Sequence, residues 1–188
     1  EAGPSFIKMG QALATRSDLL GEELAADLSE LQDRLPAFPG AQAKATIEAE
    51  FAEDMDAMFT SFDEKPIAAA SIAQVHFAVT SDGREVAVKV LRPDIEDAFN
   101  RDIDLLRWIA GLVETARPDL KRLKPREVIE TLAQTVELEM DLRFEAAAAV
   151  ELAENFEGDA DFVVPKVDWS RTGRRVMVTE RIHGVALD

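Results

Sequence analysis

Lys89 is the residue in this sequence whose type and setting most clearly suggest chemistry. It stands inside an apolar segment, Val86–Leu91, whose alternation predicts a β-strand. Burying an ammonium in such a strand is costly unless a carboxylate pairs with it. Lys89 therefore either neutralises an anionic ligand such as a nucleotide phosphate, or faces solvent on an edge strand and blocks pairing with another chain.

The neighbours of Lys89 favour a nucleotide. Residues 86–89 read Val-Ala-Val-Lys, close to the Val-Ala-Ile-Lys that carries the ATP-binding lysine of protein kinases. Ala87 shares the Lys89 face of the strand because side chains two positions apart point the same way. Its small side chain would leave room for a flat adenine ring. ATP is therefore the candidate ligand.

Kinases place a glycine-rich loop before this lysine, whereas this sequence places alanines there. No two of its nine glycines are closer than seven positions, which excludes both GxGxxG and the Walker motif. The expected position is occupied by Ala68, Ala69, Ala70 and Ser71. Small side chains still let a phosphate approach, but alanine restricts positive φ, so we expect a stiffer loop. A short alanine helix is the alternative.

Composition excludes several other classes of function. The net charge of −16 disfavours binding to nucleic acid. There is no cysteine, and His76 and His183 are too far apart for a zinc motif, so we expect no metal site. Neither histidine is assigned a catalytic role. No apolar run approaches the ~18 residues of a membrane span.

Apolar periodicity predicts long helices and short strands. Helices are expected over residues 4–35, 42–59, 94–117 and 125–155. Asp141 and Glu145 would share one face of the last helix. Strands are expected over residues 74–80, 85–91, 162–167 and 174–181. Asp82-Gly83 predicts a hairpin between the first two strands. This order indicates an α+β fold with one antiparallel sheet and helices packed on it. A plain helical bundle with a hairpin is the alternative, and it would not pair Lys89 with Glu145.

Three separated motifs resemble those of the UbiB/ADCK family of atypical, protein-kinase-like proteins. The family's Lys-x-Gly-Gln signature stands at Lys8–Gln11, and its alanine-rich loop at Ala68–Ser71. Its Glu-x-Asp motif, followed by a further glutamate, stands at Glu139–Glu145. The resemblance covers essentially the whole chain. It implies a protein-kinase-like small lobe preceded by a helical extension that carries Lys-x-Gly-Gln.

The resemblance also implies the roles of residues in the nucleotide site. Lys89 would bind the nucleotide, and Glu145 would be its helix partner in the ion pair that marks a kinase small lobe. Thr179 would occupy the gatekeeper position. Backbone groups of Glu180 and Ile182 would meet adenine at the hinge.

A regulatory contact is implied as well. Lys8 and Gln11 would project from the extension into the place where a peptide substrate docks in kinases, and Glu139 and Asp141 would meet the extension. This arrangement would block protein phosphorylation and favour ATPase or small-molecule chemistry. Two simpler interpretations remain: Lys8 as an exposed helix lysine, and Glu139 paired with Arg143 four residues on.

The expected domain division is an extension over residues 1–62 and a small lobe with a helical insert over 63–188, ending at the hinge. Neither a His-Ala-Asp catalytic loop nor an Asp-Phe-Gly metal site occurs in the sequence. Phosphoryl transfer needs metal ligands and a positioned base. We therefore expect the catalytic large lobe and the Mg²⁺ ligands to lie outside this chain, which alone would bind nucleotide weakly and not turn it over.

The resemblance places the parent protein in ubiquinone (coenzyme Q) biosynthesis, as an atypical kinase or ATPase that uses ATP and Mg²⁺. Its expected partners are ubiquinone-biosynthesis proteins or lipid-like precursors. Its expected location is cytoplasmic and peripheral to the bacterial inner membrane, or the matrix side of a mitochondrion. The alternative function is a non-catalytic interaction module or pseudokinase scaffold, which the acidic helical surface would suit.

Overall fold

The computed structural model describes residues 36–159 and 161–184, which form two compact units. The sheet unit comprises residues 36–69, 73–93 and 139–184, and the helical unit comprises 70–72 and 94–138. Residues 36–62, expected to end the N-terminal extension, belong to the sheet unit. The first 35 residues lie outside the described part, so the boundary at residue 62 stays a prediction.

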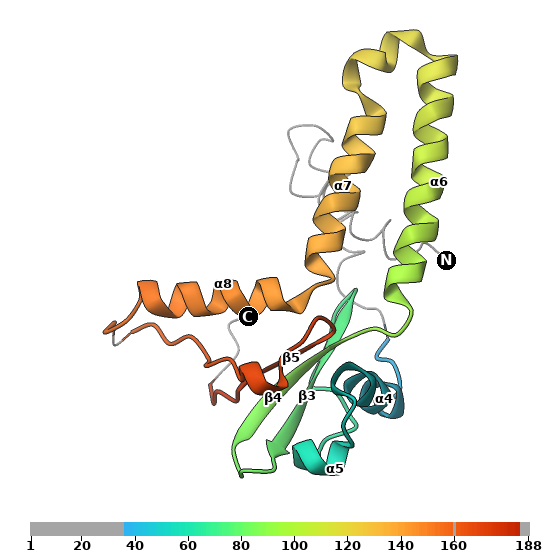
Figure 1. Cartoon of the computed structure of the whole chain (residues 1–188). Coiled ribbons are helices and arrows are strands. Elements are labelled where there is room, and N and C mark those ends of the chain that lie inside the picture. Colours follow the sequence, from blue (N-terminus) through green and yellow to red (C-terminus); the bar gives the residue numbers. More distant parts are fainter. Residues whose placement is uncertain (1–35, 160, 185–188) are drawn as a thin grey trace. The chain divides into compact units, whose positions relative to one another are not determined.

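The sheet unit is built on a five-stranded antiparallel sheet (Figure 1). Its strands are β1 (Phe59–Phe62), β2 (Ala68–Ala69), β3 (Ala73–Thr80), β4 (Glu85–Leu91) and β5 (Val176–Glu180). The order across the sheet is β1-β3-β4-β5, and β2 also pairs with β3. This architecture confirms the predicted α+β class.

The β3–β4 hairpin turns where Asp82-Gly83 predicts. The Gly83 N–H donates to the Thr80 carbonyl at 2.9 Å, and Gly83 has φ of +86°, which residues with a side chain rarely adopt. The turn sets the register of the hairpin, which places Val75 opposite Lys89.

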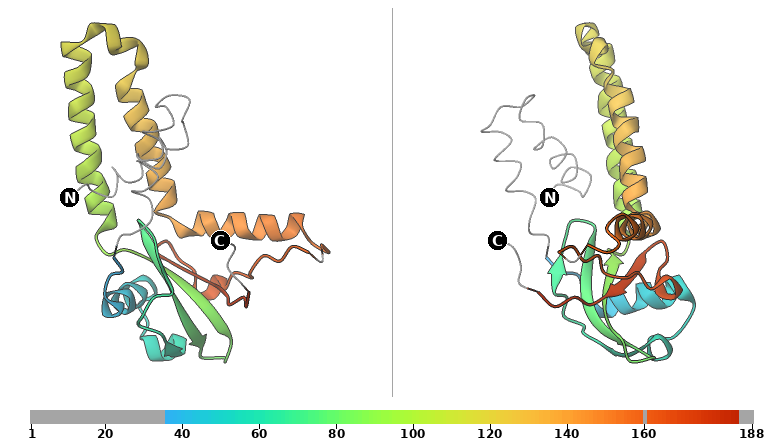
Figure 2. Two further views of the ribbon diagram at one scale, coloured as in Figure 1. Left: turned by 180° about the vertical axis from the view of Figure 1, so that it is seen from behind. Right: turned by 90° about the vertical axis from the view of Figure 1, so that its left-hand side faces the viewer.

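Helices α4 (Gly40–Phe51) and α5 (Met55–Met58) pack on one face of this sheet (Figures 1 and 2). Val86, Val88 and Val90 of β4 face these helices and are at most 1% exposed. Their buried neighbours include Ala43, Ile47, Met55, Met58, Val176 and Val178. Because strand side chains alternate, Ala87 and Lys89 lie on the opposite face.

The single helix predicted over residues 42–59 is wrong in its second half. Ala52 has a left-handed backbone (φ 52°) that ends α4, and Asp54 is extended before the short α5. From Phe59 the chain continues as β1. The apolar side chains keep a helical spacing across the break because two successive helices bury them in the same core.

The helical unit is an antiparallel pair, α6 (Ile95–Ala116) and α7 (Pro125–Glu139), joined by η1 (Pro118–Leu123) (Figures 1 and 2). Ile103, Leu106 and Ala110 recur at helical spacing on α6 and pack with Ile129 of α7. Among residues 36–159 and 161–184, no helix is long and apolar enough to cross a membrane.

The helix predicted over residues 125–155 is two helices, α7 and α8 (Leu142–Asn155). Asp141 separates them: its backbone is extended, and its carboxylate accepts a hydrogen bond from the Arg143 N–H at 3.1 Å. Aspartate is a favoured N-cap because its side chain satisfies such a donor. Asp141 is therefore not on one helix face with Glu145, contrary to expectation.

The strand predicted over residues 162–167 does not form, apart from a single bridge between Val167 and Thr179. Pro165 has no N–H to donate to a ladder. Two backbone hydrogen bonds still hold this segment along β5, from Glu180 to Lys166 and from Asp168 to Val178, both at 2.8 Å. A short 3-10 helix, η2 (Trp169–Arg171), follows.

Gln74 and His76 of β3 are at most 1% exposed and form a buried polar network on the core face of the sheet. The Gln74 amide donates to the Phe38 carbonyl and accepts from the Phe38 N–H, and its Nε2 lies 2.8 Å from His76 Nε2. His76 Nε2 must therefore be the acceptor, so Nδ1–H donates to the Asp63 carbonyl at 2.7 Å. Burial lowers the pKa of His76, which keeps the ring neutral.

We expect the free energy of unfolding to fall as pH drops below about 6.5, because the unfolded chain then takes up a proton that buried His76 resists. The slope is at most about 1.4 kcal/mol per pH unit. Denaturant titrations between pH 8 and 5 measure it. H76Q should remove this part of the pH dependence, and H183Q, at an exposed histidine, should retain it. An unchanged slope in H76Q would contradict the assignment.

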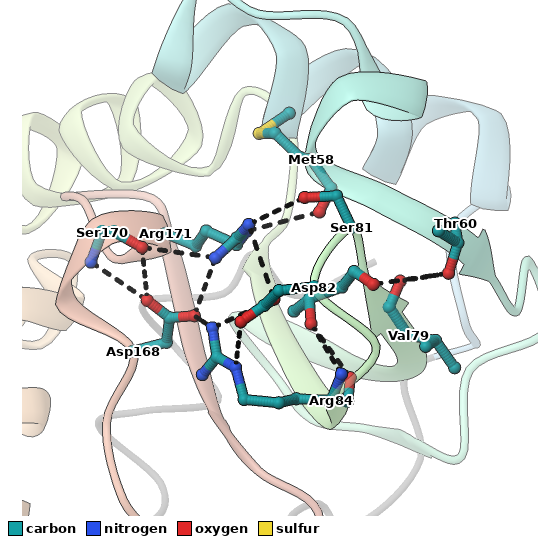
Figure 3. Close-up of polar contacts among 10 residues, drawn as sticks. Met58, Thr60, Val79, Ser81, Asp82, Arg84, Asp168, Ser170 and Arg171 are labelled. Atoms are coloured by element: carbon teal, nitrogen blue, oxygen red, sulfur yellow. Dashed lines mark hydrogen bonds and ion pairs between the residues drawn. The ribbon is translucent and has the colours of Figure 1, made fainter.

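Asp168 binds the β3–β4 turn to the segment before β5 (Figure 3). Its side chain is 8% exposed and accepts from Arg84 at 2.8 Å, from Arg171 at 3.0 Å and from the Ser170 hydroxyl at 2.6 Å. Burial alone would raise the pKa of Asp168, but these hydrogen bonds outweigh it and hold the pKa below its usual range. Asp168 is thus a structural carboxylate.

We expect D168A to lower the free energy of unfolding by about 1–3 kcal/mol, because it leaves partly buried donors unpaired. Thermal or urea unfolding measures the loss. D119A is the matched control, since Asp119 pairs with Arg117 at the surface and should change stability little. Equal effects of the two substitutions would argue against a structural role for Asp168.

Candidate functional site

Lys89 projects from the middle of β4 on the face opposite the apolar core. Hydrogen-bonded strands flank it on both sides, with Val75 of β3 and Met177 of β5 as its neighbours. Its side chain is 29% exposed. Lys89 is therefore half-buried and accessible from one side, and it does not stand on an edge strand.

Glu145 of α8 pairs with Lys89, as predicted. The Lys89 ammonium donates to Oε1 at 2.7 Å and to Oε2 at 2.6 Å. The Glu145 side chain is 48% exposed. A pair this accessible contributes about 1 kcal/mol or less to stability. The pair matters for geometry, because it holds the Lys89 ammonium in one direction and joins β4 to α8.

Ala87 and Thr179 lie side by side next to Lys89. The β4–β5 register places Thr179 directly opposite Ala87 and Met177 opposite Lys89. A small side chain beside a threonine, two residues along the strand from the lysine and on the same face, is the arrangement expected of an adenine site and its gatekeeper. The geometry suits these roles, which stay predictions.

The alanine-rich segment begins as a strand and not as a helix. Ala68 and Ala69 form β2 and pair with Val75 and Gln74 of β3. Ala68 pairs with Val75, and Val75 pairs with Lys89, so the three residues lie in one line across the sheet. Ala70 and Ser71 follow in the link between β2 and β3.

Val75 is a site neighbour that the sequence analysis did not identify. A signal for it was present, because residues 68–75 match the kinase pattern GxGxxGxV with alanine in place of each glycine and Val75 as the valine. Phe77 lies opposite Ala87, and the Arg181 guanidinium lies 3.9 Å from its ring centre. No local signal marks that contact.

The expected hinge residues follow the end of β5. The Glu180 N–H donates to the Lys166 carbonyl at 2.8 Å, so only the Glu180 carbonyl could serve an adenine amino group. Ile182 lies just beyond the strand with its side chain 57% exposed. Their role in binding adenine stays a prediction.

The expected regulatory residues are only partly described. Lys8 and Gln11 lie outside the described residues. Glu139 is the last residue of α7, and Asp141 caps α8. The carboxylate that binds Arg143 is Asp141, at 2.6 Å, and this hydrogen bond lowers the pKa of Asp141.

No cluster of three or more His, Asp or Glu side chains suited to a metal ion occurs in the described part of the chain. The residues gathered around Lys89 therefore offer a cation for phosphate and small side chains for a base.

Comparison with known proteins identifies the family of this chain. The family model described as "ABC1 atypical kinase-like domain" matches residues 30–188. The "Probable protein kinase UbiB" of Marinobacter nauticus is 44% identical over 187 residues, and that of Aliivibrio fischeri (strain MJ11) is 47% identical over 186 residues. These matches cover 100% and 98% of this chain, which spans 34% of the length of each relative.

A solved structure has the same fold. It is the complex of Rv3197 with erythromycin from Mycobacterium tuberculosis, with a TM-score of 0.68 and 32% sequence identity. The match covers 94% of this chain and 44% of that one. The antiparallel sheet and its helices are thus those of a kinase-like small lobe, and the chain belongs to the ABC1 atypical kinase-like family.

Proposed function

We propose that this chain is the nucleotide-binding small lobe of an atypical kinase or ATPase. The observation that carries the proposal is the Lys89–Glu145 ion pair, made to both carboxylate oxygens on the open face of the sheet. The adjacent Ala87 and Thr179 support it, because their small side chains stand where a nucleotide bound at Lys89 would place its base.

In this proposal each group contacts a different part of ATP. The Lys89 ammonium neutralises ATP phosphates, and Glu145 keeps the ammonium directed toward them. Ala68 and Ala69 of β2 lie along the phosphates, and a role for Ala70 and Ser71 stays a prediction. The Glu180 carbonyl and the Ile182 N–H meet the adenine edge. Mg²⁺ accompanies ATP in such reactions, and its ligands would come from elsewhere in the whole protein.

For the whole protein we propose a role in ubiquinone biosynthesis, with ubiquinone-biosynthesis proteins or lipid-like precursors as partners. The UbiB names of relatives 43–47% identical support this role. A bacterial protein of this kind would act in the cytoplasm at the inner membrane. Lys8, Gln11, Glu139 and Asp141 would restrict its substrates. This chain alone would bind nucleotide without turning it over.

One observation favours a second function, the binding of a protein partner. Leu105, Trp108, Ile109 and Leu112 recur at helical spacing on α6 and are each 40–64% exposed. An exposed apolar stripe of this kind suits an interface. A scaffold would keep its partners when Lys89 is lost, whereas nucleotide binding would not survive that change.

We expect K89A in the whole protein to weaken ATP binding by about ten-fold or more, or about 1.4 kcal/mol. Stability should change little, because the ion pair is half-exposed. Titration with a fluorescent ATP analogue measures the affinity. K44A, which removes the surface pair Lys44–Glu64, is the control. Equal affinity of K89A and the unmodified protein would contradict the proposal.

A second prediction concerns the space beside Lys89. We expect A87L to weaken binding of ATP by about ten-fold or more, because the larger side chain fills the position given to adenine, while inorganic triphosphate is affected little. Competition titrations compare the two ligands. A148L, at an exposed alanine of α8, should alter neither affinity. Equal loss of both ligands in A87L would argue against adenine at this position.

A further inference from the structure

The first turn of α8, which precedes Glu145, is held by contacts from outside the helix. The Leu142 N–H has no acceptor within α8, as is usual at a helix N-terminus, and it donates to the Arg174 carbonyl at 2.9 Å. Leu142 is fully buried, and Asp141 caps the Arg143 N–H. The position of α8 is therefore tied to the Arg174 peptide.

Glu50 of α4 holds the segment that contains Arg174. The Arg174 N–H donates to Glu50 Oε1 at 2.5 Å. Gly173 permits this approach, because a Cβ at that position would collide with the Glu50 carboxylate. The Gly173 N–H donates to the Val176 carbonyl at 2.8 Å, which keeps the segment beside β5. A series of contacts thus runs from Glu50 through Arg174 to Leu142.

Charge adds a second link between Glu50 and α8. Arg143, in the first turn of α8, forms an ion pair with Asp141 at 2.6 Å. The hydrogen bond to Asp141 raises the pKa of Arg143, and the Glu50 carboxylate adds to the rise through space. Glu50 therefore acts on the start of α8 both through Arg174 and by attraction to Arg143.

We propose that Glu50 is a positioning residue for the Lys89–Glu145 ion pair, acting through the Arg174 peptide and the first turn of α8. This inference rests on the proposed nucleotide-binding function. Lys89 is fixed by strands on both sides, so the geometry of the pair depends on where α8 starts. Ammonium–carboxylate bonds are short, about 2.7–2.9 Å, and a displaced first turn would lengthen this one.

The first test is the affinity of the whole protein for a fluorescent ATP analogue. We expect E50A to weaken binding by about five-fold or more, and E50Q by about two-fold or less, because the glutamine Oε1 still accepts from Arg174. G173A should weaken binding as E50A does, since its methyl group displaces the Glu50 carboxylate. E53A changes an exposed acid just after α4 and should leave the affinity unaltered.

A double-mutant cycle separates positioning from general damage to the fold. If Glu50 acts through Glu145, E50A should cause no further loss of affinity in an E145Q background. If the loss of ATP affinity in the double mutant equals the product of the losses caused by E50A and E145Q alone, the inference is overturned. G173A, which should displace the Glu50 carboxylate, provides the same comparison should E50A fail to fold.

Hydrogen exchange tests the inference without nucleotide. We expect amides in residues 142–146 to exchange about ten-fold faster in E50A, while those of β4 keep their rates. Unchanged exchange at the start of α8 would overturn the positioning role even if Lys89 binds ATP. Conversely, if K89A leaves ATP affinity unchanged, the proposed function fails, and the exchange rates alone decide whether Glu50 positions α8.

Discussion

The ion pair between Lys89 and Glu145 joins two elements that are held in very different ways. Lys89 belongs to a central strand with hydrogen-bonded neighbours on both sides. Glu145 belongs to α8, of which only Leu142 and Ala146 are buried. The sheet therefore fixes the cation, whereas the position of the acid depends on the contacts at the beginning of its helix.

Burial explains why this pair matters for geometry more than for stability. With 29% and 48% of the two side chains exposed, water screens their attraction, and the bond contributes little to the free energy of folding. An accessible ammonium beside Ala87 and Thr179 is, however, well placed for a phosphate. The buried polar groups of Gln74, His76 and Asp168 stabilise the surrounding framework instead.

The parts predictable from sequence were those encoded by local patterns. Alternation marked β4, Asp-Gly marked its turn with β3, and the Val-Ala-Val-Lys segment identified Lys89. The two helices predicted over residues 42–59 and 125–155 failed for a common reason, which is that periodicity does not reveal breaks between elements. Apolar spacing continues past Ala52 and Asp141, and β1 and β2 are too short to show alternation. The contacts of Glu50 with Arg174 and of Phe77 with Arg181 were missed because they join residues far apart in the sequence, and no local pattern marks them.

The most direct test of the central claim is to identify the lysine that lies against the phosphates of bound ATP. An acyl-phosphate derivative of ATP, which acylates such lysines, can be applied to the whole protein and the modified residue mapped by mass spectrometry. We expect modification of Lys89 that excess ATP suppresses, with Lys44 and Lys166 unprotected. Modification elsewhere, or modification of Lys89 that ATP does not suppress, would contradict it.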